Sequence, residues 1–270
     1  MIIIAEKING SIPSVAKAIS EKDEAFLRDL AVRQSEAGAT YIDVCSSVAP
    51  EVEFDTMRWM LDLVQDATDT PISVDSPNAE CLVQLLPYVK KPGLVNSVSG
   101  EGNKIDLVFP AIADTKWEVM ALLSDDTGIP KSAADRLRVF DNIMAAAEKY
   151  GIAPNRIHID PLVEMLCTSE DGIAMVIEVI TSIKKRYPTI HISGAVSNIS
   201  FNLPARKLVN IGFVVLAMNA GMDSAIFDPL DKQLLGVIYA TEALLGMDDF
   251  CMEYITAFRE ERIAAVNKKK

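Results

Sequence analysis

The chain has 270 residues, of which 50% are hydrophobic and 24% are charged, so it can bury a globular core and does not belong to the disordered or collagen-like classes. Its formal net charge of −12 repels phosphate and argues against a nucleic acid or an anionic membrane as the main partner. The chain opens without a secretory leader, and its apolar runs are too short to span a bilayer, so we expect a cytoplasmic protein.

Short runs rich in β-branched residues alternate with longer runs of helical period. We predict eight strands, at residues 2–4, 41–44, 72–75, 94–96, 119–123, 156–160, 190–192 and 224–226. Alternation of strands and helices is typical of a parallel sheet, and eight such units in 270 residues fit a closed (β/α)8 barrel, the TIM-barrel fold. An open doubly wound sheet is the alternative, but the G-x-G-x-x-G turn that usually follows its first strand is absent.

The clearest predicted helix covers residues 132–150. Ser132 is a suitable N-cap with Asp135 three residues later, and Gly151 supplies the C-terminal stop. Further helices are predicted at residues 23–37, 168–186 and 204–219, and apolar helices at 234–245 and 250–258. Since no Pro- or Ser-rich linker interrupts the pattern, we predict one domain over residues 1–270.

Metal binding is not expected from the sequence. The four cysteines are scattered and none forms a C-x-x-C pair, which is typical of free thiols in a reducing compartment. The only histidines are His158 and His191. His158 should point into the barrel, two residues before Asp160, and we interpret it as a core histidine with satisfied hydrogen bonds.

Polar side chains close most of the predicted strands. The active site of a TIM barrel lies at the carboxyl ends of its strands. The polar residues found there are Glu6, Asn9, Asp43, Asp75, Asn96, Ser124, Asp160, Ser197, Asn198 and Asp228. Any one of them could instead cap the helix that follows its strand, so the pattern as a whole carries the inference.

Two of these carboxylates, Asp75 and Asp160, end buried runs and should project over the barrel mouth. Burying a carboxylate is unfavourable unless a partner pairs with it. The cations that the sequence offers nearby are Lys7, Lys116 and Arg206. A neutral planar ligand rich in N–H groups would also satisfy the carboxylates. A pterin fits, because its N3–H and 2-amino group form a two-donor edge that matches one carboxylate, and Asn96 can both donate and accept beside it.

Seven segments of the chain resemble one family. They are IIAEKING (3–10), YIDV (41–44), SVDS (73–76), VNS (95–97), DDTGIP (125–130), DPL (160–162) and VSNISF (196–201). They are similar to the pterin-binding methyltransferases that act between methyltetrahydrofolate and a corrinoid protein. That family shares its fold with dihydropteroate synthase and with the folate region of cobalamin-dependent methionine synthase. The resemblance extends from residue 2 to about residue 242.

The resemblance implies roles for individual residues. Asp75, Asn96 and Asp160 match the family's pterin-holding triad. Asn198, in the pair that it forms with Ser197, matches the amide that approaches N5 of the folate. A neutral amide of this kind can accept from N5–H or donate to its lone pair, so it can stabilise charge that develops at N5.

Two further residues are assigned by the same resemblance, and three by their positions at the strand ends. Asn202 falls where relatives often have a glutamine that contacts the pterin, and Arg206 matches a basic residue on the corrinoid side of the pocket. Glu6, Asn9 and Asp43 are expected behind the residues that touch the pterin.

The activity implied is that of a methyltransferase acting between a protein-bound corrinoid and N5 of tetrahydrofolate, as the tetrahydrofolate-methylating component of a demethylase system. The corrinoid is expected on a separate protein, because the chain has no Asp-x-His-x-x-Gly cobalamin motif. A homodimer is expected from the apolar C-terminal helices and from the family. The alternatives are a dihydropteroate synthase, which needs a basic anion site, and a folate-binding module without catalytic activity.

Overall fold

The computed structural model describes residues 1–264, and the end of the expected domain at residue 270 lies outside them. Its strands are β1 (Ile2–Asn9), β2 (Tyr41–Cys45), β3 (Ile72–Asp75), β4 (Leu94–Gly100), β5 (Glu118–Asp125), β6 (Ile157–Asp160), β7 (His191–Ile192) and β8 (Ser224–Phe227). Each overlaps a predicted strand, and β1 and β4 extend five and four residues beyond their predicted ends.

Helices follow every strand. They are α1 (Pro13–Glu21), α2 (Glu24–Glu36), α3 (Pro50–Ala67), α4 (Ala79–Leu85), α5 (Lys104–Ile112), α6 (Ala133–Tyr150), α7 (Ala174–Arg186), α8 (Arg206–Ala220), α9 (Lys232–Leu244) and α10 (Met252–Arg259). Short 3-10 turns include η2 (Pro154–Arg156), η3 (Leu166–Thr168) and η4 (Val196–Ser200). Within residues 1–264, no helix is both long and apolar enough to cross a membrane.

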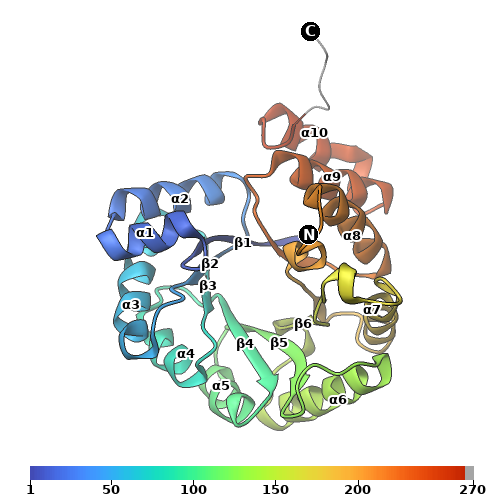
Figure 1. Ribbon diagram of the computed structural model, residues 1–270, viewed down its shortest axis with the longest axis horizontal. Helices are drawn as coiled ribbons and strands as arrows, with labels where there is room; N and C mark the ends of the chain where they lie inside the picture. The colour runs from blue at the N-terminus through green and yellow to red at the C-terminus, as the bar shows by residue number, and fades with distance from the viewer. Residues whose placement is uncertain (265–270) are drawn as a thin grey trace.

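The strands form one parallel sheet that closes on itself. Its order is β7-β6-β5-β4-β3-β2-β1-β8, and the ring of strands is surrounded by the helices (Figure 1). At the seam between β7 and β8, the Asp223 N–H donates to Ile192 O at 3.2 Å and the Ile226 N–H donates to Gly194 O at 3.0 Å. These bonds complete the predicted (β/α)8 barrel and exclude the open doubly wound sheet.

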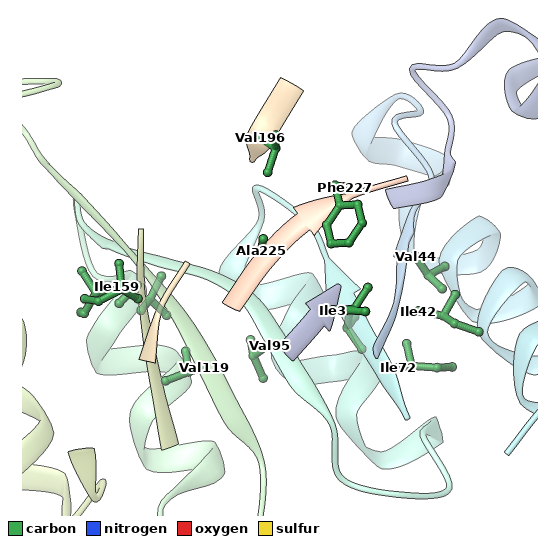
Figure 2. Close-up of a cluster of buried hydrophobic side chains, with 14 of the residues drawn as sticks. Ile3, Ile42, Val44, Ile72, Val95, Val119, Ile159, Val196, Ala225 and Phe227 are labelled. Carbon is green, nitrogen blue, oxygen red and sulfur yellow. The ribbon is translucent and has the colours of Figure 1, made fainter. Parts of the chain in front are cut away.

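Side chains alternate between the two faces of the sheet, because successive residues of a strand point in opposite directions. One set packs between the strands and the helices, and Ile3, Ile42, Val95 and Val119 belong to it (Figure 2). The other set fills the barrel interior with a small apolar cluster whose buried members are Ile4, Tyr41, Leu94 and Met120. The polar residues of the mouth share this interior face, because each lies two positions after an interior residue of its strand. They are Asp43 after Tyr41, Asp75 after Ser73, Asn96 after Leu94 and Asp160 after His158.

Local signals explain where the helices begin. Ser132 caps α6, since its Oγ accepts the Asp135 N–H at 3.1 Å, and Gly151 ends that helix at φ 71°, as predicted. Helix α7 begins at Ala174 rather than near residue 168. The residues before it form a turn in which Gly172 has φ 60°, a conformation outside the helical region, so the predicted start was wrong.

The prediction for His158 is confirmed. The side chain is fully buried, its Nε2 lies 2.7 Å from Glu118 Oε2, and its Nδ1 lies 3.0 Å from Ser224 Oγ. Burial lowers the pKa of the imidazole, which favours the neutral ring. This cluster lies at the amino-terminal end of the barrel, since Glu118 and Ser224 begin their strands.

Candidate functional site

Three neighbouring strands bring a cluster of polar side chains to the mouth of the barrel. Asp43 on β2 accepts a hydrogen bond from Ser73 Oγ at 2.6 Å and another from Asn96 Nδ2 at 3.1 Å, both on Oδ1. Asp75 ends β3 and is the register partner of Asn96 on β4. Asp75 and Asn96, two members of the predicted triad, are therefore adjacent, and Asp43 lies close to both.

The carboxyl groups of Asp43, which is buried, and Asp75, which is half-buried, lie close to each other. Burial raises the pKa of Asp43 to about 6, although the bonds from Ser73 and Asn96 oppose the shift. Burial and the charge of Asp43 raise the pKa of Asp75 well above its usual value. Such groups hold a proton at unusually high pH, or need a ligand that donates hydrogen bonds to them.

The third triad member lies on the other side of β5. Asp160 ends β6 and pairs in register with Leu122, whereas Asn96 pairs with Met120 on the same strand. All three triad residues thus occupy the carboxyl end of the barrel and share the interior face. Asp160 is only 7% exposed, and its Oδ1 accepts the Leu162 N–H at 2.7 Å.

The cation closest to Asp160 is not one of those expected. Burial raises the pKa of Asp160 to about 6, while the Leu162 N–H and the charge of Arg136 lower it. Arg136 lies on α6, and its fully buried side chain was missed because nothing in its local sequence marks it. Lys116 precedes β5, at the opposite end of the barrel, so its expected place at the mouth was wrong. Lys7 forms an ion pair with Asp228 at 3.4 Å.

The segment that carries Asn198 is the 3-10 turn η4, which follows β7. Ile199 from η4 lines a cavity of about 480 Å³ together with Leu162 and Arg136, so η4 adjoins the loop after β6. Within residues 1–264, the side chain of Asn198 forms no hydrogen bond, and it is half-buried. Its amide is therefore free to bind a ligand at the mouth.

Arg206 and Ser197 stabilise the shape of η4. Arg206 Nη2 donates to Ser197 O at 2.8 Å, and its Nε donates to Ser200 Oγ at 3.0 Å. The guanidinium also lies 4.6 Å from the centre of the Phe201 ring, a cation–π contact. Burial raises the pKa of Glu6 on β1, and the charge of Arg206 is among the weaker influences that oppose this shift.

Glu6, Asn9 and Asn202 occupy three different positions. Burial, followed by the charges of Asp228 and Asp43, raises the pKa of Glu6 to about 7. Asn9 Oδ1 accepts the Ser11 N–H at 2.9 Å, which gives it a role in a turn. Asn202 is exposed at φ 63°, and its Nδ2 lies 3.7 Å from Met165 Sδ. Asparagine adopts this backbone conformation more readily than glutamine does.

The mouth therefore offers a half-buried acceptor on β3, a buried acceptor on β6, an amide on β4 and, at η4, an amide that forms no side-chain hydrogen bond within residues 1–264. Within the described residues, no group of three or more His, Cys, Asp or Glu side chains is arranged to hold a metal ion. Such a site is suited to binding and orienting a planar donor-rich molecule, with an uncharged group beside it.

Comparison with known proteins agrees with this description. Residues 11–228 match the family model described as "Pterin binding enzyme". The chain is 51% identical over 271 residues to a methylcorrinoid:tetrahydrofolate methyltransferase of Eubacterium limosum, with all of both chains covered. It is 26% identical over 240 residues to methionine synthase of Mycobacterium tuberculosis, which covers 84% of this chain and 20% of that protein.

Solved structures give the same fold. A dihydropteroate synthetase with its product superposes with a TM-score of 0.70 at 17% identity, covering 91% of this chain and 94% of that one. The dihydropteroate synthase of Xanthomonas albilineans with 4-aminobenzoic acid gives a TM-score of 0.67 at 18% identity, covering 92% of each chain.

Proposed function

Because the chain belongs to the pterin-binding enzyme family, we propose that it transfers a methyl group from a methylcorrinoid protein to N5 of tetrahydrofolate. The observation that carries this proposal is the 51% identity to the methylcorrinoid:tetrahydrofolate methyltransferase over the full length of both chains. The acceptor groups at the mouth of the barrel support it independently. A reduced pterin presents an edge of N–H donors, and such donors can bind to those carboxylates.

The roles of the binding residues follow from their chemistry. Asp160, when ionised, accepts the N3–H and the 2-amino group of the pterin, and Asp75 and Asn96 orient the ring from β3 and β4. Binding of these donors offsets the cost of keeping the carboxylates buried. The pterin ring is thereby fixed relative to the incoming methyl group, which is the main contribution that a protein can make to an in-line displacement.

Asn198 is proposed to act at N5. When N5 attacks the methyl carbon, the nitrogen gains positive charge, and the amide oxygen of Asn198 can accept from an N5–H bond as that charge develops. The absence of a hydrogen bond to this side chain within residues 1–264 leaves the amide free to turn. The bond from N5 to the methyl carbon forms as the methyl–cobalt bond of methylcobalamin on the partner protein breaks. Both electrons of the broken bond stay on cobalt, which leaves as Co(I), and N5 then releases its proton to solvent. As part of the same proposal, Arg206 is assigned to the corrinoid side of the mouth.

The remaining expectations belong to the same proposal. We propose that the chain acts as a single pterin-binding domain in the cytoplasm, as one component of a demethylase system. A homodimer is supported by exposed apolar side chains on α9, α10 and the turn between them, Leu244, Met247, Phe250 and Met252. Apolar patches of this kind mark contact surfaces between proteins.

A direct assay tests the function. Purified protein is mixed anaerobically with methylcobalamin and tetrahydrofolate, and the loss of the methyl–cobalt band is followed in the visible spectrum. We expect enzyme-dependent loss of that band together with 5-methyltetrahydrofolate, identified by mass. A parallel reaction with a pterin pyrophosphate and p-aminobenzoate tests the dihydropteroate synthase alternative. Product in that reaction alone would overturn the proposal, and binding of tetrahydrofolate without turnover would indicate a folate-binding module.

A further inference from the structure

We propose that Arg136 is a positioning residue for the reaction, which clamps the turn after β6 and thereby orients Asp160 toward the folate. The proposal rests on the proposed function, because it concerns the carboxylate that would hold the pterin. No motif of the sequence marks Arg136, and its position on α6 places it outside the strand ends where the binding residues lie.

The Arg136 side chain has 0% exposure, and its guanidinium donates to four acceptors. Its Nε donates to Pro130 O at 3.2 Å, and its Nη1 donates to Leu162 O at 2.7 Å and to Pro161 O. Its Nη2 donates to Glu164 Oε2 at 2.6 Å. One side chain thus joins the loop after β5 to the loop after β6, and it satisfies carbonyl groups that would otherwise lack a partner.

The turn that Arg136 clamps is the one that holds Asp160. Leu162 has φ 63°, a left-handed conformation that is unfavourable for a leucine and needs support from its surroundings. The N–H of the same residue donates to Asp160 Oδ1 at 2.7 Å. Leu162 therefore connects Arg136 to Asp160. Its carbonyl accepts from the guanidinium, and its N–H donates to the Asp160 carboxylate, so the guanidinium can fix the orientation of that carboxylate.

Arg136 also controls the charge of Asp160. Its positive charge lowers the pKa of this buried carboxyl group, which burial would otherwise raise further than about 6. Other charged groups around the strand are Glu164 and Lys131, which pair with each other at 2.8 Å, and Glu118, His158 and His191 toward the opposite end of the barrel. The pterin edge needs the ionised form, because protonation turns one carboxyl oxygen into an O–H donor that would face one of the two pterin donors. Folate affinity should fall as the pH drops below the pKa of Asp160.

The chain contains a matched control at the other end of β6. Arg156 immediately precedes the strand, and its Nη2 donates to Ile112 O at 2.7 Å and to Trp117 O at 2.6 Å. It is likewise an arginine that clamps carbonyl groups, but it lies at the amino-terminal end of the barrel, away from Asp160. Loss of either arginine should destabilise the fold, and only loss of Arg136 should alter folate binding.

The test measures tetrahydrofolate affinity by anaerobic titration calorimetry from pH 5 to pH 8 for four proteins: wild type, Arg136→Gln, Arg156→Gln and Glu164→Gln. In each profile, the midpoint is the pH at which affinity begins to fall as Asp160 takes up its proton. Arg136→Gln should raise this midpoint by about one pH unit. Below the midpoints of both the wild type and the variant, the variant should bind about tenfold more weakly, and near pH 8 its affinity should approach that of the wild type. Arg156→Gln should lower the melting temperature and keep the wild-type midpoint. Glu164→Gln should lower the midpoint, because it leaves the charge of Arg136 uncompensated.

The possible results separate the two proposals. A midpoint for Arg136→Gln that equals that of Arg156→Gln overturns the role of Arg136 and leaves the proposed function intact. If Arg136→Gln does not fold, Glu164→Gln decides, since a lowered midpoint supports the role and an unchanged or raised midpoint overturns it. A wild-type protein that does not bind tetrahydrofolate at any pH overturns both proposals.

Discussion

Asn96 and Asp43, 53 positions apart in the chain, are joined across the mouth of the barrel by a hydrogen bond of 3.1 Å from Asn96 Nδ2 to Asp43 Oδ1. The bond fixes the orientation of the Asn96 amide, because its nitrogen side must face the carboxylate. The oxygen of Asn96 then remains as an acceptor for a ligand. The mouth therefore presents acceptors from β3, β4 and β6, which fits a ligand that is mainly a donor.

Replacing Asn198 by alanine tests the amide at N5. Asn198→Ala should lower the turnover number for methyl transfer about 100-fold or more, the usual effect of removing one preorganised transition-state contact. Folate affinity should fall much less, because the carboxylates hold the pterin edge. Steady-state kinetics with a calorimetric titration would measure both. Asn219→Ala, on the exposed surface of α8, is the matched control. An unchanged turnover number for Asn198→Ala would exclude the assignment.

Replacing Asp160 by asparagine tests the pterin edge. An amide oxygen accepts one donor well, while its NH2 group faces the second donor, so Asp160→Asn should weaken tetrahydrofolate binding about 10- to 100-fold. Titration calorimetry at pH 8 measures the change. Asp141→Asn, on the solvent-exposed side of α6, should leave affinity at the wild-type value. Equal affinities for the wild type and Asp160→Asn would mean that another residue holds the edge.

Replacing Asp43 by asparagine tests how much the buried carboxylate lowers the free energy of unfolding. Its pKa of about 6 lies above the unfolded value of 3.8, so its ionisation destabilises the fold above pH 6, and that cost disappears as the pH falls toward 4. Asp43→Asn keeps an oxygen for Ser73 and Asn96, and it should raise the free energy of unfolding at pH 8 by about 1–3 kcal/mol. Urea titrations at pH 8 and pH 5 should show the gain shrinking at the lower pH. A loss of stability at pH 8 would contradict this explanation.

Gly10 tests the close packing of the loops at the mouth. A Cβ atom at this position would lie 1.8 Å from the backbone oxygen of Ser46, so Gly10→Ala must displace the loop after β2 and should cost about 1–3 kcal/mol of stability. Among residues 1–264, apart from its chain neighbours and the backbone of its own helix, nothing lies within 4 Å of an ideal Cβ at Gly212 on α8, so Gly212→Ala should instead stabilise the helix by up to about 1 kcal/mol. Thermal unfolding compares the two variants. A Gly10→Ala variant as stable as the wild type would show that the loop after β2 can move without loss of stability.

The sequence predicted the strands well because most are short apolar runs between helical stretches, and the placement of Asp75, Asn96 and Asp160 at one end of the barrel follows from their positions at the ends of those runs. What the sequence could not predict depends on contacts between distant loops. Arg136 looks like an ordinary residue of an amphipathic helix, and its burial results from carbonyl groups in two separate loops. The late start of α7 is likewise not marked by the helical period, because the chain turns at Gly172 (φ 60°) after η3, which itself contacts η4.

The most direct test of this account is a crystal structure of the protein with tetrahydrofolate. We expect the pterin in the barrel mouth, with its N3–H and 2-amino group on the Asp160 carboxylate, its ring between β3 and β4 near Asp75 and Asn96, and N5 within hydrogen-bonding distance of the Asn198 amide. A folate bound outside the mouth, or one whose N–H edge contacts neither Asp160 nor Asp75, would contradict it.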